Sequence, residues 1–250
     1  MTYVWISCGS VRPRHGGQAA RLRGPASWPM PRVQMPSETL TRADEPGEPD
    51  PRRYVALAPA APEGPVDLPA LWPATRDGEI ELEIGFGRGM FLIERAHAAP
   101  DARLLGIEIK RKWAYLVSER AKRLELAGVR VFGADARDVL LRLGPDHCLA
   151  RAFMHFPDPW WKKRHAKRRL RGQDTLDPLA RLLRPGAELF IQTDVEDRAQ
   201  DFVADLRGHG AFEVPADPFI ADHAYGARSN REKRAITDGL PVYRILVRRR

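Results

Sequence analysis

Cysteine is scarce in this chain of 250 residues, and long apolar runs are missing from it. Cys8 and Cys148 are the only cysteines, too few and too far apart in the sequence for a disulfide framework or a zinc site. No apolar stretch approaches the roughly 20 residues of a membrane-spanning helix, and Val4-Trp5-Ile6 is too short for the core of a signal peptide. These absences favour a protein of the reducing cytoplasm that binds neither a membrane nor a metal.

Acidic residues are missing from positions 1–37, which carry five arginines. Up to about Trp72, Pro, Ala, Gly and Arg dominate, without the periodicity of a helix or a strand. A transit peptide and a start codon placed upstream of the true one, at Met30 or Met35, both remain open. We predict a disordered or mis-assigned tail over residues 1–50, a linker over 51–78 that docks on the domain, and one domain over 79–250.

Basic residues outnumber acidic ones, 41 Lys and Arg against 33 Asp and Glu, which gives a formal charge of +8. Such an excess favours an anionic partner, most often nucleic acid. Charge alone leaves a merely basic surface equally open. Hydrophobic residues make up 43% of the chain, which is enough for a packed globular domain.

Strand-like and helix-like segments alternate from Glu79 onward. Strands are predicted over residues 79–84, 103–108, 129–132, 150–156 and 188–192, and helices over 89–98, 111–126, 136–143, 174–183 and 195–206. Two more strands are expected near 212–214 and 242–247. This alternation predicts an α/β fold with a doubly wound, mostly parallel sheet of seven strands and an antiparallel addition at one edge.

Glycines and acids gather where the predicted strands end. The first strand runs into Glu83-Ile84-Gly85-Phe86-Gly87, and Glu108, Asp135, Asp158 and Asp194 follow the later strands. Ligands of an open α/β sheet bind at this edge. Met90 stands where the dinucleotide fingerprint needs its third glycine, and Glu83 would repel a pyrophosphate but attract an ammonium group.

The two acids that follow suit a nucleoside. Glu108 is placed to accept hydrogen bonds from both hydroxyls of a ribose, and Asp135 to accept one from an adenine amino group. The segment resembles the class I S-adenosylmethionine-dependent methyltransferases, which have a Rossmann-like fold. The resemblance implies S-adenosylmethionine as cofactor, bound by Glu83, Gly85, Gly87, Glu108 and Asp135.

A basic and aromatic run follows the fourth strand. Asp158 stands between two prolines, which stiffen the loop. Trp160 and Trp161 come next, followed by seven Lys and Arg within residues 162–171. Cations beside indole rings are typical of sites that hold looped or single-stranded RNA. Ahead of this loop, we predict that Phe153, Met154 and Phe156 belong to the core.

Residues 153–169, together with residues 83–87, 106–108 and 193–194, resemble the motifs of bacterial tRNA (guanine-N7)-methyltransferases. The resemblance extends from about Arg53 onward and implies tRNA as partner, with the variable loop as target. It implies that Asp158 contacts the cofactor and is catalytic. The substrate contacts implied are Trp160, Lys162, Arg164, Asp194, Ser229, Asn230, Arg231 and Glu232. In the family's Thr-Lys-Phe-Glu-x-Arg motif, Asn230 and Arg231 replace the lysine and the aromatic residue.

Guanine N7 has a free lone pair, so methylation there needs alignment rather than a base. A carboxylate near the base, Asp158 or Asp194, would stabilise the positive charge that develops, and Trp160 or Trp161 would receive the unstacked guanine. One alternative is an amino-methyltransferase, since Asp158-Pro159-Trp160 is similar to a motif that holds an exocyclic amine. A catalytically silent tRNA-binding protein is the other. A monomer and a homodimer are both compatible with the sequence.

Overall fold

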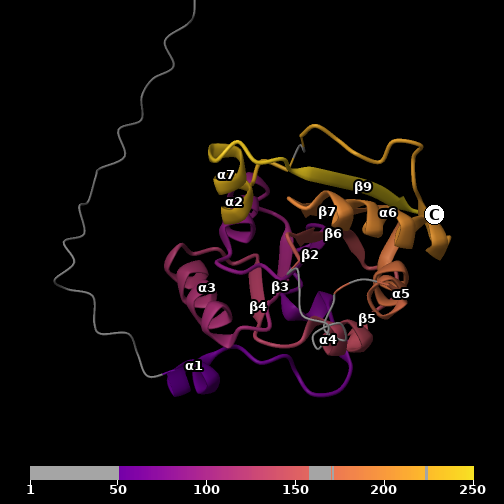
Figure 1. The fold of residues 1–250 in the computed structure, drawn as a ribbon. Helices are drawn as coiled ribbons and strands as arrows, with labels where there is room; N and C mark the ends of the chain where they lie inside the picture. Colours follow the sequence, from indigo (N-terminus) through magenta and orange to yellow (C-terminus); the bar gives the residue numbers. More distant parts are fainter. Residues whose placement is uncertain (1–50, 158–169, 171, 223–224) are drawn as a thin grey trace, which may run out of the picture. The chain divides into compact units, whose positions relative to one another are not determined.

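A seven-stranded, mostly parallel sheet organises the chain in the computed structural model, which describes residues 51–157, 170, 172–222 and 225–250 (Figure 1). The strand order is β4-β3-β2-β6-β7-β9-β8. The strands are β2 (Ile80–Ile84), β3 (Arg103–Ile107), β4 (Val129–Phe132), β6 (Leu149–His155), β7 (Leu183–Thr193), β8 (Phe212–Glu213) and β9 (Tyr243–Arg249). The predicted fold class is confirmed, including the antiparallel strands at one edge.

Both faces of β2 are buried, and its apolar and acidic residues alternate between them. Ile80, Leu82 and Ile84 join the larger hydrophobic cluster, while Glu81 and Glu83 point to the opposite face. The buried Glu81 carboxylate accepts hydrogen bonds from two guanidinium groups, those of Arg95 at 2.7 and 2.8 Å and Arg151 at 2.8 Å. These partners compensate for its loss of hydration.

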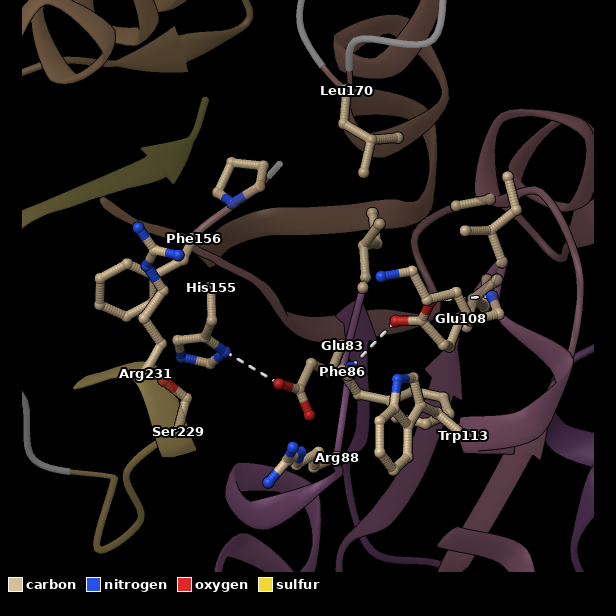
Figure 2. Close-up of a pocket in the computed structure, with 18 of the residues that line it drawn as sticks. Glu83, Phe86, Arg88, Glu108, Trp113, His155, Phe156, Leu170, Ser229 and Arg231 are labelled. Carbon is tan, nitrogen blue, oxygen red and sulfur yellow. Dashed lines mark hydrogen bonds and ion pairs between the residues drawn. The ribbon is translucent and has the colours of Figure 1, made fainter. Parts of the chain in front are cut away.

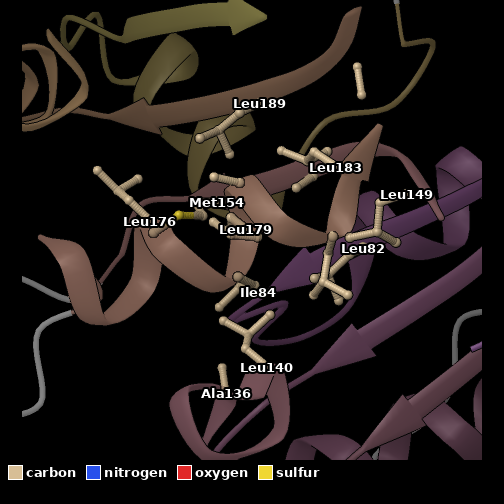
Figure 3. Packing of buried hydrophobic residues seen from close by; sticks show 14 of the residues in the cluster. Leu82, Ile84, Ala136, Leu140, Leu149, Met154, Leu176, Leu179, Leu183 and Leu189 are labelled. Atoms are coloured by element: carbon tan, nitrogen blue, oxygen red, sulfur yellow. The ribbon is translucent and has the colours of Figure 1, made fainter. Parts of the chain in front are cut away.

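Helices cover the sheet from two sides. α2 (Met90–Ala98) and α3 (Arg111–Arg123) pack on one face in a cluster that contains Leu92 and Val117. α4 (Ala136–Arg142), α5 (Gln173–Leu182) and α6 (Glu196–His209) pack on the other. Figure 3 shows Leu140 and Leu179 from these helices among the side chains of β2 and β6. This double winding leaves the carboxyl ends of the parallel strands open for a ligand.

Several elements lie outside the predicted pattern. α1 (Pro51–Leu57) buries Tyr54, and a short 3-10 helix (Pro69–Leu71) precedes the buried Trp72. β1 (Val66–Asp67) pairs in parallel with β5 (Leu143–Gly144) in a separate two-stranded sheet. The segment before Ile80 therefore contributes to the core.

A long connection joins the two carboxyl-terminal strands. β8 and β9 are antiparallel, but the connection between them contains α7 (Asn230–Thr237). β9 lies between β7 and β8 and pairs antiparallel with both. In the described part of the chain, no helix is both long and apolar enough to cross a membrane.

Candidate active site

A cavity of about 550 Å³ lies at the carboxyl ends of β2, β3, β4 and β6 (Figure 2). Its walls come from the turns that follow these strands and from the first residues of α7. Five of the predicted cofactor contacts line the cavity: Glu83, Gly85, Gly87, Glu108 and Asp135. Asp158 lies outside the described residues.

The glycine turn after β2 forms an open cradle. Gly85 and Gly87 have φ values of +74° and +54°, and a Cβ added to either would meet no atom within 4 Å. Glycine adopts this left-handed conformation without strain, and its missing side chain leaves the backbone accessible. Gly89 is different, because a Cβ there would come within 2.6 Å of the Val117 side chain. Gly85 and Gly87 therefore serve the cavity, and Gly89 serves the packing of α2 on α3.

Glu108 links two walls of the cavity. Its Oε2 accepts a hydrogen bond from the backbone N–H of Gly87 at 2.9 Å, and its Oε1 accepts one from that of Lys110 at 2.8 Å. The residue is 7% exposed. Each carboxylate oxygen has two lone pairs, so one on each oxygen is left for a ligand. The two backbone bonds hold the carboxylate in a fixed orientation toward such a ligand.

Glu83 and His155 form a buried pair on neighbouring strands. The Nδ1 atom of His155 lies 3.0 Å from Oε1 of Glu83, and both residues line the cavity (Figure 2). Glu83 is 2% exposed and His155 is 6% exposed. Among the described residues, Glu83 Oε2 and His155 Nε2 have no hydrogen-bond partner. Buried polar atoms are normally paired, and both of these atoms belong to residues of the cavity wall.

Asp135 caps α4 and forms an ion pair with Arg137. Its Oδ1 accepts from the backbone N–H of Arg137 at 3.0 Å, and its Oδ2 pairs with the Arg137 guanidinium at 2.6 Å. This hydrogen bond to Asp135 raises the pKa of Arg137. Asp135 therefore presents a compensated carboxylate at the cavity rather than an isolated charge.

The opposite wall is formed at the start of α7. Ser229 caps this helix through its Oγ, which accepts from the backbone N–H of Glu232 at 3.2 Å. Arg231 donates to Asp194 Oδ2 from Nη2 at 2.7 Å, and its guanidinium lies 5.6 Å from the ring centre of Phe156. Ser229, Asn230 and Arg231 all line the cavity.

Other predicted substrate contacts lie behind this wall or outside the described residues. Glu232 is fully buried and accepts from the Arg244 guanidinium at 2.8 Å, so it supports α7 from beneath the cavity surface. Asp194 stands behind Arg231 and is not among the residues that line the cavity. Trp160, Lys162 and Arg164 lie outside the described residues.

The prediction that Phe153, Met154 and Phe156 are all core residues is wrong for Phe156. Phe153 and Met154 are buried, but Phe156 lies beyond the end of β6 with φ +47° and lines the cavity. His155 and Trp113 also line it and were not predicted. The sequence did carry a signal for His155. It ends a strand that contains Phe, Met and Ala, and such a strand leaves a polar side chain few partners.

A cation–π contact lies in the wall of the cavity. The Arg88 guanidinium lies 5.3 Å from the centre of the Trp113 ring, and both residues line the cavity (Figure 2). Within the residues for which side-chain positions are described, no group of three or more His, Cys, Asp or Glu is arranged to hold a metal ion.

Comparison with known proteins gives results consistent with this geometry. A family profile described as "Putative methyltransferase" matches residues 77–245. The chain is 36% identical over 171 residues to the tRNA (guanine-N(7)-)-methyltransferase of Synechococcus sp. (strain JA-3-3Ab). The aligned region covers 68% of this chain and 72% of that protein. The chain is also 36% identical to the enzyme of that name from Myxococcus xanthus (strain DK1622), over 67% of this chain and 82% of the relative.

Solved structures show the same fold at low sequence identity. The crystal structure of the 16S rRNA methyltransferase KamB matches with a TM-score of 0.52 and 15% identity. The match covers 73% of this chain and 91% of that one. It supports the arrangement of the sheet and carries no information about the substrate.

Proposed function

Because the chain belongs to the tRNA (guanine-N7)-methyltransferase family, we propose that it transfers a methyl group from S-adenosylmethionine to N7 of a guanine in tRNA. The observation that carries the proposal is the cavity at the strand ends, whose glycine turn and acids suit this cofactor. We propose the variable loop as the site of modification and the cytoplasm as the compartment.

The cavity residues fit the cofactor. A buried carboxylate oxygen without a partner, Glu83 Oε2, suits an ammonium group. The cradle at Gly85 and Gly87 leaves room where side chains would otherwise stand. Glu108 has an open lone pair on each oxygen for the two ribose hydroxyls. Asp135 would lie at the adenine end.

When bound, S-adenosylmethionine supplies an electrophilic methyl group on a sulfonium. Guanine N7 has its own lone pair, so this chain needs no general base and acts by alignment. Glu108, fixed by two backbone N–H groups, would orient the nucleoside end of the cofactor. Phe156 and the start of α7 would form the wall that faces the guanine.

The Asp194–Arg231 pair argues against Asp194 as the carboxylate that stabilises charge on the methylated base, which leaves Asp158 of the two predicted candidates. The Arg231 guanidinium already neutralises Asp194, at 2.7 Å. A paired carboxylate is a weaker electrostatic partner for a developing cation than an unpaired one. Asp158 is thus the proposed catalytic residue. Trp160, Lys162 and Arg164 are proposed to hold the RNA.

Identification of the product tests this function. The full-length protein is incubated with unmodified tRNA and S-adenosylmethionine labelled on the methyl group, and the tRNA is digested to nucleosides. Label in 7-methylguanosine is expected. Label in a nucleoside methylated on an exocyclic amine would overturn the proposal in favour of an amino-methyltransferase. Cofactor binding without label in any nucleoside would favour a tRNA-binding protein without catalysis.

A further inference from the structure

Phe156 has a backbone conformation that aromatic residues rarely adopt. It follows His155, the last residue of β6, and its φ is +47°. Left-handed values are rare for bulky residues, because the side chain crowds the backbone. The backbone N–H of Phe156 donates to the carbonyl oxygen of Gln192 on β7 at 2.6 Å, which holds the residue at the end of the strand. Residues kept in such a conformation are concentrated at functional sites.

The left-handed turn takes the Phe156 ring out of the alternation of β6. Within the strand, Met154 faces the larger hydrophobic cluster, while Phe153 and His155 lie together on the opposite face. A regular continuation of the strand would place Phe156 on the side of Met154, in the core. The residue is instead only partly buried and lines the cavity. The turn therefore gives the cavity wall a flat, apolar group.

The Arg231 guanidinium is held over this ring. Its Cζ lies 5.6 Å from the centre of the Phe156 ring (Figure 2). Nε and Nη2 of Arg231 both donate to Asp194 Oδ2, at 3.1 and 2.7 Å. The Asp194 side chain is 14% exposed and the Arg231 side chain 53% exposed. A mostly buried carboxylate thus anchors an exposed guanidinium against the ring, and both planar groups belong to the wall of the cavity.

An aromatic ring and a guanidinium are the planar groups on which proteins stack unpaired bases. The N7 lone pair of guanine lies in the plane of the base, so a base that is stacked on its face keeps this lone pair open to a methyl donor. Methylation then makes the base cationic. An unpaired arginine would repel that charge, whereas Asp194 neutralises Arg231. The two planar groups can therefore hold the base without opposing the charge that forms.

We propose that Phe156 and Arg231 form a stacking site for the target guanine. Asp194 is a positioning residue, which holds the guanidinium and cancels its charge. The inference rests on the proposed function, because it assumes that the methylated base is a guanine of tRNA. The sequence predicts Trp160 or Trp161 as the residue that receives the base, and this site adds a stacking surface from the described part of the chain.

Two substitutions of Phe156 separate stacking from packing. Phe156→Leu removes the ring and stays apolar, and Phe156→Tyr keeps the ring. Phe219→Leu is the matched control, because Phe219 is also partly buried but does not line the cavity. Thermal unfolding checks that each variant is folded. The Kd of S-adenosylhomocysteine, measured by calorimetry, should change by less than about threefold in every variant, because the site contacts the base and not the cofactor.

The target base is the second variable of the experiment. With S-adenosylhomocysteine present, filter binding is measured for intact tRNA and for the same tRNA without the base at the methylated position. For Phe156→Leu, the Kd of intact tRNA should rise roughly fivefold to a hundredfold, the range that base–aromatic stacking spans. The Kd of the abasic tRNA should stay within about twofold of the wild type. The kcat/KM for methylation should fall with the affinity for intact tRNA, and Phe156→Tyr should recover most of it.

Three results would overturn the inference. The first is an unchanged Kd of intact tRNA in Phe156→Leu. The second is an equal loss for the abasic tRNA, which would assign the effect to the RNA backbone or to a general change of the cavity. The third is an equal loss in Phe219→Leu, which would assign it to packing.

A second variant covers the case in which Phe156→Leu does not fold. Arg231→Gln changes a side chain that is 53% exposed, and it allows the same comparison of intact and abasic tRNA. A loss confined to intact tRNA is expected, and an absent loss or an equal one for both tRNAs would overturn the inference. If the wild-type protein forms no 7-methylguanosine, the proposed function fails instead, so the two failures are distinguishable.

Discussion

Replacing Glu108 with glutamine tests the most constrained contact of the cavity. Both carboxylate oxygens accept a backbone N–H, from Gly87 at 2.9 Å and from Lys110 at 2.8 Å. A glutamine offers one oxygen and one NH₂ group, so one of these N–H groups would face a donor. A ribose hydroxyl that loses its hydrogen bond to the charged Glu108 side chain forfeits about 1.5–3 kcal/mol of binding free energy. The charge that would receive the ribose hydroxyls is lost as well.

The Kd of S-adenosylhomocysteine should therefore rise roughly tenfold to a hundredfold in Glu108→Gln, because 1.4 kcal/mol corresponds to a factor of ten. Calorimetry gives this value, and filter binding should show an unchanged affinity for tRNA. Glu119→Gln is the control: Glu119 pairs with Lys122 at 2.8 Å on the exposed side of α3. Cofactor binding of Glu108→Gln within about twofold of the wild type would refute the assignment of Glu108 to the ribose.

Four further changes test other parts of the molecule. Gly87→Ala requires a side chain at φ +54°; it should lower Tm by about 2–4 °C and weaken binding of S-adenosylhomocysteine in calorimetry, whereas unchanged binding would contradict an open cradle. Asp194→Asn and Arg231→Ala should each lower kcat/KM for tRNA, and the double variant should lose no more than the stronger single one, because the two side chains share one ion pair; additive losses would show that they act separately. The logarithm of tRNA affinity should fall with a slope of about 3 or more against the logarithm of salt concentration, because residues 162–171 carry seven cations; a flat response in filter binding would exclude this run as the RNA contact. Burial raises the pKa of the Cys148 thiol to about 11, so its alkylation by iodoacetamide at pH 8 should be roughly a hundredfold slower than that of a free cysteine and should accelerate toward pH 11; a fast reaction at pH 8, read by mass spectrometry of its peptide, would contradict this burial.

The sheet could be predicted because its strands follow simple hydrophobic patterns. β2, β3, β4 and β6 begin and end within one residue of the predicted ranges. β7 begins at Leu183, five residues before the predicted start, because Arg184-Pro185-Gly186 has the composition of a turn after a helix. These residues instead lie in an irregular part of β7, between its pairing with β6 at Leu183 and at Glu188, and proline and glycine are tolerated at such bulges.

α7 could not be predicted from periodicity, because few of its side chains are buried. Within Asn230–Thr237, the buried residues are Glu232 and Ala235. The helix is fixed by the Ser229 cap and by the ion pair of Glu232 with Arg244, which comes from β9. Such long-range charge pairing leaves no repeating pattern in the sequence.

The residues of the candidate site could also be predicted only in part. Glu83, Glu108 and Asp135 could be predicted because every parallel strand delivers its last residue to one edge of the sheet. Phe156 was missed because it follows an apolar strand, where a cavity wall and a core look alike in sequence. Only the three-dimensional structure shows that the turn at Phe156 re-aims the ring toward the cavity.

The position of β9 between β7 and β8 has a consequence for the nascent chain. β7 ends at Thr193 and β9 begins at Tyr243, fifty residues later, so the ribosome finishes β7 well before its antiparallel partner exists. At 5–20 residues per second, this delay is roughly 3 to 10 seconds. During that interval Leu189 and Ile191, fully buried in the folded protein, belong to an unpaired edge strand, the kind of surface that promotes aggregation. Until β9 is made, the β7 edge is therefore a site at which the nascent chain is prone to aggregate.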